Sequence, residues 1–233
     1  MKKKLVVLSG AGMSQESGLK TFRDMGGLWE QYDVTEVASI DAWETNRSLV
    51  MEFYNQRRKQ LFEVEPNAGH YGIAELEKWF NVEIITQNVD DLHERAGSTK
   101  VMHLHGELRK VRSTIDPSLI YVLNDWELRI GDRCELGSQL RPHIVWFGEP
   151  VPAMYEAIPI VQKADILVVI GSSLVVYPAA SLVNYVKAGV PVFVIDPNRP
   201  ETYVKNVTYI EEKAGKGVEI LKEKLINQIE NEK

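Results

Sequence analysis

Cysteine is almost absent from this sequence, since Cys134 is the one such residue among 233. A single thiol excludes an intramolecular disulfide framework and any zinc site built from several cysteines. The chain also lacks a tract of clustered lysine and arginine, and its formal net charge is -6. Because phosphate backbones are bound by clustered basic residues, we expect no nucleic acid partner.

Long hydrophobic runs are missing as well. The basic start, Lys2 to Lys4, is followed by only a short apolar run before Ser9. That run is too short for the apolar region of a signal peptide and for a membrane helix. We therefore expect a cytoplasmic protein with no membrane partner. With 44% hydrophobic and 26% charged residues, the composition is typical of a globular protein with a sizeable core.

Apolar runs alternate with amphipathic stretches along the chain, which is the pattern of a mostly parallel sheet covered by helices. Two segments interrupt the alternation: residues 35–64 have a helical pattern, and residues 109–140 are short, polar and turn-rich. The predicted strands are 5–9, 82–86, 101–104, 144–147, 166–170, 192–195 and 208–210, and the predicted helices are 69–79, 155–163, 179–188 and 218–231. The sequence thus predicts an α/β fold with two insertions.

A glycine-rich turn, Ser9-Gly10-Ala11-Gly12-Met13-Ser14, follows the first predicted strand. Small residues at a strand end let the backbone approach a pyrophosphate, and the amides of a following helix can bind the anion. The segment departs from the dinucleotide fingerprint G-x-G-x-x-G, because Gln15 stands where the third glycine would be. We therefore expect a nucleotide here but no ordinary hydride-transfer site. Taken alone, Gly10 and Gly12 are better explained by a plain glycine-rich turn before an ordinary helix.

Amide and carboxylate side chains gather after the second predicted strand, in Thr86-Gln87-Asn88-Val89-Asp90-Asp91. Open α/β sheets bind ligands at the carboxyl ends of their strands. Gln87 and Asn88 each offer a donor and an acceptor, and Asp90 can accept hydrogen bonds from a ribose or an amide. A binding site is the better interpretation of this group, whereas Asp91 fits a helix cap.

Two histidines, His103 and His105, project to the same side of a predicted strand. Such a pair could belong to a metal site, but no cysteine or nearby acidic pair completes a ligand set, so we predict no metal. His105 stands beside a glycine at a strand end, where it suits a general base near neutral pH. We expect His103 to pack or to make a structural hydrogen bond.

Five motifs occur together in the order of one family. They are Gly10-Ala11-Gly12-x-Ser14-x-x-Ser17-Gly18 with Phe22-Arg23, Thr86-Gln87-Asn88-x-Asp90, His105-Gly106, Ile144-Val145-Trp146-Phe147-Gly148-Glu149 and Gly171-Ser172-Ser173. Over nearly its whole length the chain resembles the sirtuins, which are NAD-dependent protein-lysine deacylases. The resemblance implies a Rossmann-like parallel sheet with helices on both faces, over residues 1–34, 68–108 and 141–233. It also implies a small domain built from two insertions, residues 35–67 and 109–140.

The resemblance implies NAD as the cofactor, acylated lysine in proteins or peptides as the substrate, and nicotinamide and O-acyl-ADP-ribose as products. His105 would be the general base, and Asn88 would orient ribose or water. Asp196 stands where sirtuins usually have asparagine, which favours NAD over its phosphorylated form. The implied cofactor-binding residues are Gly10, Ala11, Gly12, Ser14, Phe22, Arg23, Trp29, Gln87, Asn88, Asp90, Gly171, Ser172, Ser173, Asp196, Asn198 and Ala214.

Substrate binding is implied at two loops between which the modified peptide would add as a strand. Gly148, Glu149 and Val176 belong to these loops, whereas Val145, Trp146 and Phe147 would line the tunnel for the aliphatic stem of the lysine. Tyr54 and Arg57 are three apart and so lie on one helix face. Family members that remove acidic acyl groups resemble this chain there, with the hydroxyl and guanidinium holding the distal carboxylate. This implies removal of succinyl and malonyl groups as well as acetyl. Without the resemblance, a solvated helix face with a packing tyrosine is the simpler interpretation.

The chain departs from the family in its second insertion. Most sirtuins hold a structural zinc there with four cysteines, whereas this segment contains only Cys134. That zinc site cannot be built, and we expect the small domain to be held by packing around Ile115, Leu119, Tyr121 and Trp126.

Two other classes of function stay open. An NAD glycohydrolase or ADP-ribosyl transferase would cleave nicotinamide from NAD without an acyl-lysine, and the peptide-cleft segments argue against it. A non-catalytic NAD-sensing module would tolerate loss of the base, and the presence of His105 and Asn88 argues against that. We expect a monomer.

Overall fold

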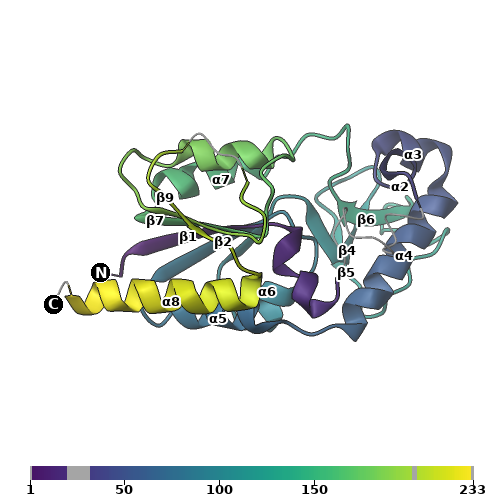
Figure 1. Cartoon of the computed structure of the whole chain (residues 1–233). Helices are drawn as coiled ribbons and strands as arrows, with labels where there is room; N and C mark the ends of the chain where they lie inside the picture. The colour runs from purple at the N-terminus through teal and green to yellow at the C-terminus, as the bar shows by residue number, and fades with distance from the viewer. Residues whose placement is uncertain (1, 20–31, 201–203, 232–233) are drawn as a thin grey trace.

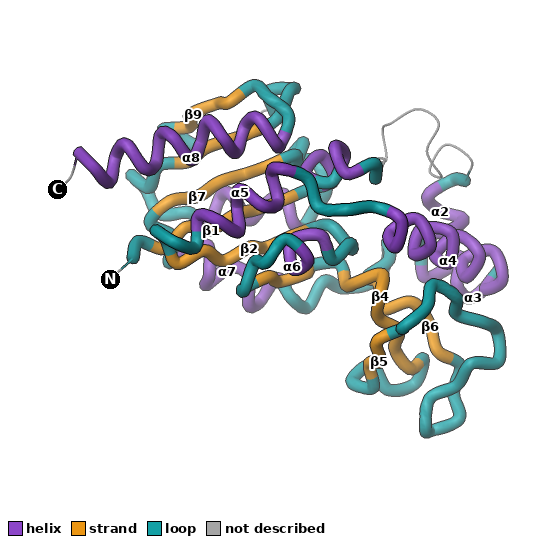
Figure 2. The backbone as a smooth tube through the Cα atoms, turned by 90° about the horizontal axis from the view of Figure 1, so that it is seen from below, coloured by secondary structure: helices purple, strands orange, loops and turns teal. Residues whose placement is uncertain are grey.

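The computed structural model describes residues 2–19, 32–200 and 204–231. A six-stranded parallel sheet lies at one end of the molecule, and a three-stranded antiparallel sheet with a group of helices lies at the other (Figures 1 and 2). The predicted α/β class with a parallel sheet and a second, smaller unit is confirmed.

The large sheet has the strand order β3-β2-β1-β7-β8-β9. Its strands are β1 (Lys4–Ser9), β2 (Asn81–Thr86), β3 (Val101–His103), β7 (Ile166–Ile170), β8 (Val192–Ile195) and β9 (Val207–Ile210). In the register, the last residue of β1, Ser9, lies beside Thr86 of β2 and Ile170 of β7. Strands β2 and β3 thus lie on one side of β1, and β7, β8 and β9 lie on the other. The loops after β1 and β7 therefore meet at the carboxyl edge of the sheet, where open α/β sheets bind ligands.

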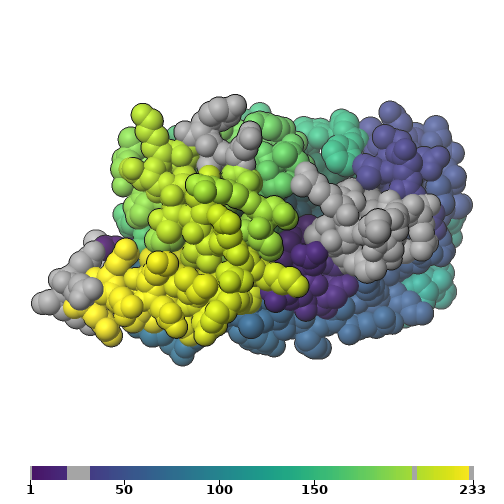
Figure 3. Space-filling view, in the orientation of Figure 1, coloured from purple at the N-terminus to yellow at the C-terminus, as the bar shows by residue number. Residues whose placement is uncertain are grey.

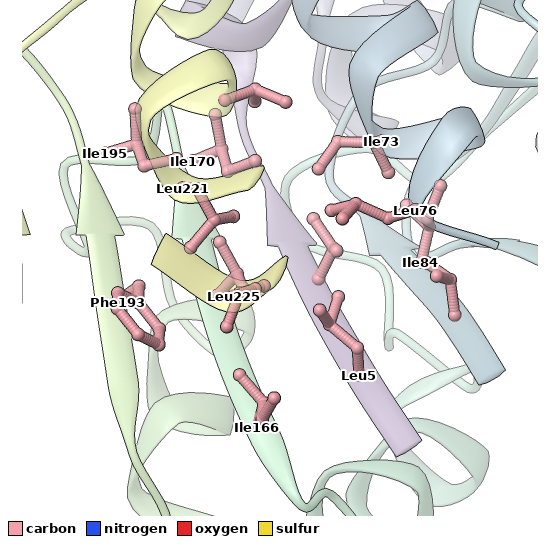
Figure 4. Close-up of a cluster of buried hydrophobic side chains, with 14 of the residues drawn as sticks. Leu5, Ile73, Leu76, Ile84, Ile166, Ile170, Phe193, Ile195, Leu221 and Leu225 are labelled. Carbon is pink, nitrogen blue, oxygen red and sulfur yellow. The ribbon is translucent and has the colours of Figure 1, made fainter. Parts of the chain in front are cut away.

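Helices cover both faces of this sheet. Alternate residues of β1 face opposite ways, so Leu5 packs under α5 (Ala68–Leu76) and α8 (Ala214–Asn231), while Val6 packs under α7 (Met154–Gln162) and the 3₁₀ helix η3 (Ala179–Tyr185). Because both faces are buried, β7 is apolar throughout. Figure 4 shows the α5 and α8 side, with Leu5, Ile73, Leu76, Ile84, Ile166, Ile170, Phe193, Ile195, Leu221 and Leu225.

The two segments that interrupt the alternation share one core. The first forms α2 (Val34–Val37), α3 (Ile40–Thr45) and α4 (Arg47–Glu63), and the second forms β4 (Gly106–Ser113), β5 (Ile120–Val122) and β6 (Leu140–Ile144) in the order β5-β4-β6. Trp43 and Phe53 of the helices pack with Val111 and Ile144 of the strands. Short elements follow the large strands: η1 (Ala11–Met13) and η2 (Gln15–Ser17) after β1, and α6 (Leu92–Arg95) after β2.

Two buried polar side chains of α4 fasten the irregular part of the second segment. Asn55 donates to the Leu128 carbonyl and accepts from the Leu128 N–H, both at 2.9 Å. Arg58 donates to the carbonyls of Leu108 and Trp126, and burial lowers its pKa to about 10. These contacts hold β4 and the loop after β5 against the helix.

Some predicted boundaries and core residues are wrong. The strand expected at 144–147 ends at Ile144, because the backbone then turns at Gly148, whose φ is 89°. The helix expected at 179–188 is a 3₁₀ helix that ends at Tyr185. Ile115 is 64% exposed, because it lies in a bend whose amides bond to the Ser113 hydroxyl, so it is no core residue.

The remaining small-domain candidates, Leu119 and Tyr121, pack partly against the shared core, and Trp126 is half-buried. Within the described residues, no helix combines the length and the apolar character that crossing a membrane would require.

Candidate active site

The loops after β1 and β7 lie directly against each other. Gly10 donates its N–H to the Ile170 carbonyl and Gly12 donates to Gly171, both at 2.9 Å. A Cβ on Gly10 would lie 2.7 Å from the Gly171 carbonyl oxygen, and one on Gly12 would lie 2.7 Å from the Gly171 Cα. Gly171 itself has a φ of 58°. Glycine is therefore required at these positions by loop-to-loop contact as well as by any approach of a phosphate.

Ser14 joins the loop after β1 to the loop after β2. Its hydroxyl donates to Asp90 Oδ2 at 2.9 Å and accepts from Asn88 Nδ2 at 3.0 Å. All three side chains are buried, and burial raises the pKa of Asp90. The second oxygen of Asp90 accepts the N–H of Leu92 at 3.2 Å, at the start of α6. The arrangement holds one amide and one carboxylate in fixed positions at the carboxyl edge of the sheet.

Two buried histidines lie behind Ser14. His70 Nδ1 accepts the N–H of Asn67 at 3.2 Å, and its Nε2 lies 3.5 Å from the Ser14 hydroxyl. His93 Nε2 lies 3.0 Å from the Ser9 hydroxyl, and the two rings are 4.9 Å apart. Burial lowers the pKa of His70 to about 4 and that of His93 well below its usual range, so both are neutral at pH 7.

Sequence reasoning passed over these histidines because both lie within short helices. The signal that could have found His70 is its place in the capping box of Asn67, which ties it to the start of α5.

His105 is held as a neutral imidazole. Its Nδ1 lies 3.1 Å from the Gln87 carbonyl oxygen, which can only accept, so Nδ1 carries the hydrogen and Nε2 carries the free lone pair. Burial lowers the pKa of His105 despite this hydrogen bond. A Cβ on the next residue, Gly106, would lie 2.0 Å from the His143 carbonyl oxygen, so a glycine must follow the histidine.

His103 makes structural hydrogen bonds, as expected. Its Nδ1 lies 2.9 Å from the Asn88 carbonyl oxygen and its Nε2 lies 2.8 Å from Glu94 Oε1. Burial acts to lower the pKa of His103, but the Glu94 carboxylate and the Asn88 carbonyl outweigh this effect. The pKa of His103 is therefore raised. Within residues 2–19, 32–200 and 204–231, no three His, Cys, Asp or Glu side chains cluster as a metal site.

The other cofactor candidates line the same edge. Gln87 Nε2 donates to the Ser172 hydroxyl at 3.2 Å, linking the loops after β2 and β7. Asp196 follows β8 and accepts the N–H of Asn198 at 2.8 Å. Ser173 adjoins Ser172, Ala11 lies in η1, and Ala214 begins α8. Phe22, Arg23 and Trp29 fall outside the described residues.

Glu16, in the turn after β1, reaches the start of α8. Its carboxylate accepts the Gly215 N–H at 2.8 Å, which supplies a partner for an amide of the first helical turn. In the space-filling view the purple N-terminal segment accordingly reaches the surface beside the yellow-green C-terminal part (Figure 3). This contact explains why α8 begins four residues before the predicted start at 218.

Tyr54, Arg57 and Trp146 come together where α4 meets the end of β6. The Trp146 indole Nε1 donates to the Tyr54 hydroxyl at 2.9 Å. The Arg57 guanidinium lies 5.7 Å from the ring centres of both Phe53 and Tyr54. Burial lowers the pKa of Arg57, while the hydroxyl of Tyr54 and the charge of Asp90 act to raise it.

The predicted peptide-binding residues differ in their exposure. Phe147 is 52% and Val176 42% exposed, which suits contact with a peptide, whereas Val145 is half-buried and Trp146 is buried. Phe147 exchanges backbone hydrogen bonds with Ala38 and Ile40, so the chain there pairs with the first small-domain segment. Gly148 forms the turn beside it.

Glu149 lies in one of the two loops predicted to pair with the peptide, and its side chain is used inside the protein. Its carboxylate turns inward, where it accepts from Arg141 at 2.7 and 2.9 Å and from the Trp146 N–H at 2.9 Å. Burial acts to raise the pKa of Glu149, but these hydrogen bonds and the arginine charges leave it lowered. The Glu149 side chain thus contacts Arg141 and the backbone of Trp146 inside the protein.

A family profile and individual proteins of known activity match this chain in sequence. The profile of the Sir2 family matches residues 10–178. The chain is 54% identical over 230 residues to an NAD-dependent protein deacylase of Bacteroides thetaiotaomicron, covering 96% of this chain and 98% of that protein. It is 55% identical over 227 residues to an NAD-dependent protein deacylase of Helicobacter pylori, with 96% and 98% covered.

Solved structures agree with the sequence comparison. A Sir2 homolog crystallised as a complex with NAD superposes with a TM-score of 0.88 at 39% identity, over 97% of this chain and 91% of that one. A Sir2 homologue mutant in complex with ADP-ribose gives a TM-score of 0.89 at 39% identity, over 98% and 94%. Because the family profile covers well over half of the chain and the relatives match along almost their whole length, the chain belongs to the Sir2 family.

Proposed function

We propose that this protein removes acyl groups from lysine side chains of proteins, using NAD and releasing nicotinamide and O-acyl-ADP-ribose. The single observation that supports this most is the buried cluster in which Ser14 holds both Asn88 and Asp90. The loop after β2 that carries them also supplies the Gln87 carbonyl that orients His105. A base and a pair of ribose or amide ligands thus share one edge of a Rossmann-like sheet.

The residues at this edge fit NAD by their chemistry. Bound NAD supplies the ribose carbon from which nicotinamide leaves. Asp90 is an acceptor for the amide hydrogens of a carboxamide, and Gln87 and Asn88 offer donors and acceptors to a ribose. Asp196, at the end of β8, suits free ribose hydroxyls and repels a phosphate, so we expect NAD rather than its phosphorylated form.

His105 serves as the general base in this proposal. The Gln87 carbonyl keeps the hydrogen on Nδ1, so that Nε2 is free of a proton and can take one from a ribose hydroxyl. Because burial lowers the pKa of His105, the base stays unprotonated at pH 7.

Acidic acyl groups are the proposed preference of the pocket. Arg57 carries a planar donor fork suited to a carboxylate, and it lies against the ring of Tyr54 on α4. A succinyl or malonyl group on the substrate lysine would present its distal carboxylate to this pair. The charge of Asp90 acts on Arg57, which supports a position for this pair near the proposed nicotinamide site.

Matched peptides test the proposal directly. The purified protein is incubated with NAD and with peptides that differ only in carrying acetyl-lysine, succinyl-lysine or unmodified lysine, and all products are weighed. We expect loss of the acyl mass together with nicotinamide and O-acyl-ADP-ribose, and faster turnover of the succinyl peptide. Release of nicotinamide and free ADP-ribose at the same rate without any acyl peptide would point to a glycohydrolase instead.

A further inference from the structure

The hydroxyl of Tyr54 is used as an acceptor inside the protein. The indole N–H of Trp146 has no acceptor character, so the 2.9 Å contact between Nε1 and the Tyr54 oxygen uses a lone pair of that oxygen. Tyr54 and Trp146 are 1% and 2% exposed, so water does not compete for this contact. The hydroxyl hydrogen must then point away from the indole.

Tyr54 keeps that hydrogen at neutral pH. Burial raises the pKa of Tyr54, and the opposing effects of Arg57, Trp146 and Arg141 do not cancel the rise. The residue is therefore a neutral phenol whose one hydrogen is a donor. A hydrogen bond from a phenol to a carboxylate is charge-assisted and stronger than a neutral one.

The indole of Trp146 has two aromatic or cationic neighbours, of which Arg141 is the nearer. The Arg141 guanidinium carbon lies 3.6 Å from the centre of one face, and the ring of Trp43 lies 5.4 Å away, centre to centre. Arg141 in turn makes a two-pronged pair with Glu149, at 2.7 and 2.9 Å, and also donates to the Ile144 carbonyl at 3.1 Å. Glu149 accepts the backbone N–H of Trp146 at 2.9 Å. The ion pair thus fixes both the backbone and the ring of Trp146.

From this geometry we propose that Trp146 is a specificity-determining residue that turns the Tyr54 hydroxyl hydrogen toward the distal carboxylate of the acyl group, and that Arg141 is a positioning residue that acts through Trp146. The inference rests on the proposed function, because it takes that carboxylate to lie between Tyr54 and Arg57. A planar guanidinium is required at Arg141, since a lysine ammonium has neither the flat face nor the two-pronged geometry.

The test measures kcat/KM for succinyl and acetyl peptides of the same sequence, and the quantity compared is their ratio. Trp146→Phe keeps an aromatic ring but removes the N–H, and we expect it to lower the succinyl-to-acetyl ratio roughly threefold to tenfold, the value of one hydrogen bond. Arg141→Lys should shift the ratio in the same direction. Trp43→Phe is the matched control, because it shortens the neighbouring indole without removing the donor to Tyr54, and it should leave the ratio unchanged.

A double-mutant cycle separates orientation from simple packing. If Trp146 acts through the Tyr54 hydroxyl, Trp146→Phe added to Tyr54→Phe should change the ratio no further. The proposal is overturned if Trp146→Phe lowers both activities in proportion, or if its effect on the ratio persists in full in the Tyr54→Phe background. Failure of the acyl pocket itself would give a different result. The wild-type protein would then not act on the succinyl peptide, and Arg57→Met would leave the ratio unchanged. That result would overturn both the preference for acidic acyl groups and the role of Trp146.

Discussion

Replacing Arg57 by methionine isolates the charge in the proposed acyl pocket. Methionine is close to arginine in length and can keep packing on the rings of Phe53 and Tyr54, which lie 5.7 Å from the guanidinium. The substitution thus removes the positive charge and its donors while retaining apolar contact. We expect the ratio of kcat/KM for succinyl over acetyl peptides to fall.

The magnitude follows from the type of interaction lost. A hydrogen bond to a charged group contributes about 1.5–3 kcal/mol, which corresponds to a roughly 10- to 150-fold fall in the ratio.

The assay compares the two peptides in one reaction vessel, so that errors in enzyme concentration cancel. Lys59→Met is a matched control, since Lys59 is exposed on the same helix. If Arg57→Met slows both reactions in proportion, or leaves removal of the succinyl group untouched, Arg57 is a surface residue and the pocket is not selective for acidic groups.

Four further predictions concern the proposed base, a buried hydrogen-bond pair, zinc and an ion pair. His105→Ala should lower turnover by about 10²–10⁴-fold while NAD still binds in a calorimetric titration; near-normal turnover would exclude it as the base. Asn55→Ala should lower the free energy of unfolding by about 1–3 kcal/mol, because it leaves the buried N–H and carbonyl of Leu128 without partners; an unchanged denaturation midpoint would contradict this. Elemental analysis should find no stoichiometric zinc, and chelation should leave activity intact; one tightly held zinc per chain would make His103 and Cys134 the first ligands to examine. The pKa of Glu94 is lowered from 4.5 and that of His103 is raised from 6.5, so the ion pair should stabilise the protein most between pH 4.5 and 6.5 and should lose its effect as pH rises through the raised pKa of His103. Glu94→Gln should therefore lower the melting temperature more at about pH 5.5 than at about pH 8.5. An equal fall in melting temperature at both pH values would contradict this prediction.

The large sheet was predictable because its strands are rich in apolar residues and two of them, β7 and β8, are wholly apolar. The predicted range 166–170 coincides with β7, which is buried on both faces and therefore carries no polar residue. The small sheet was missed because β4 has only two large apolar residues, Leu108 and Val111, and the adjacent charged residues Arg109 and Lys110 break the alternation that indicates a strand. Its partner β6 contains Pro142, which weakens any strand prediction.

The motifs predicted that the candidate residues would lie at the carboxyl edge of the sheet, but they could not predict the hydrogen bonds between them. The spacing of Ser14, Asn88 and Asp90 along the chain does not reveal that one hydroxyl joins the other two. The hydrogen bond from Trp146 to Tyr54 likewise joins the segment after β6 to α4. Such contacts join segments far apart in sequence, and no local pattern encodes them.

The central claim is that cleavage of NAD in this protein is coupled to removal of an acyl group from lysine. The most direct measurement counts nicotinamide released and lysine freed of its acyl group in the same reaction, by mass spectrometry, with the succinyl peptide and the wild-type protein. Coupling predicts equal amounts of both at every time point, with almost no nicotinamide when the peptide is unmodified. Nicotinamide released in excess of freed lysine, at a rate independent of the acyl peptide, would contradict the account.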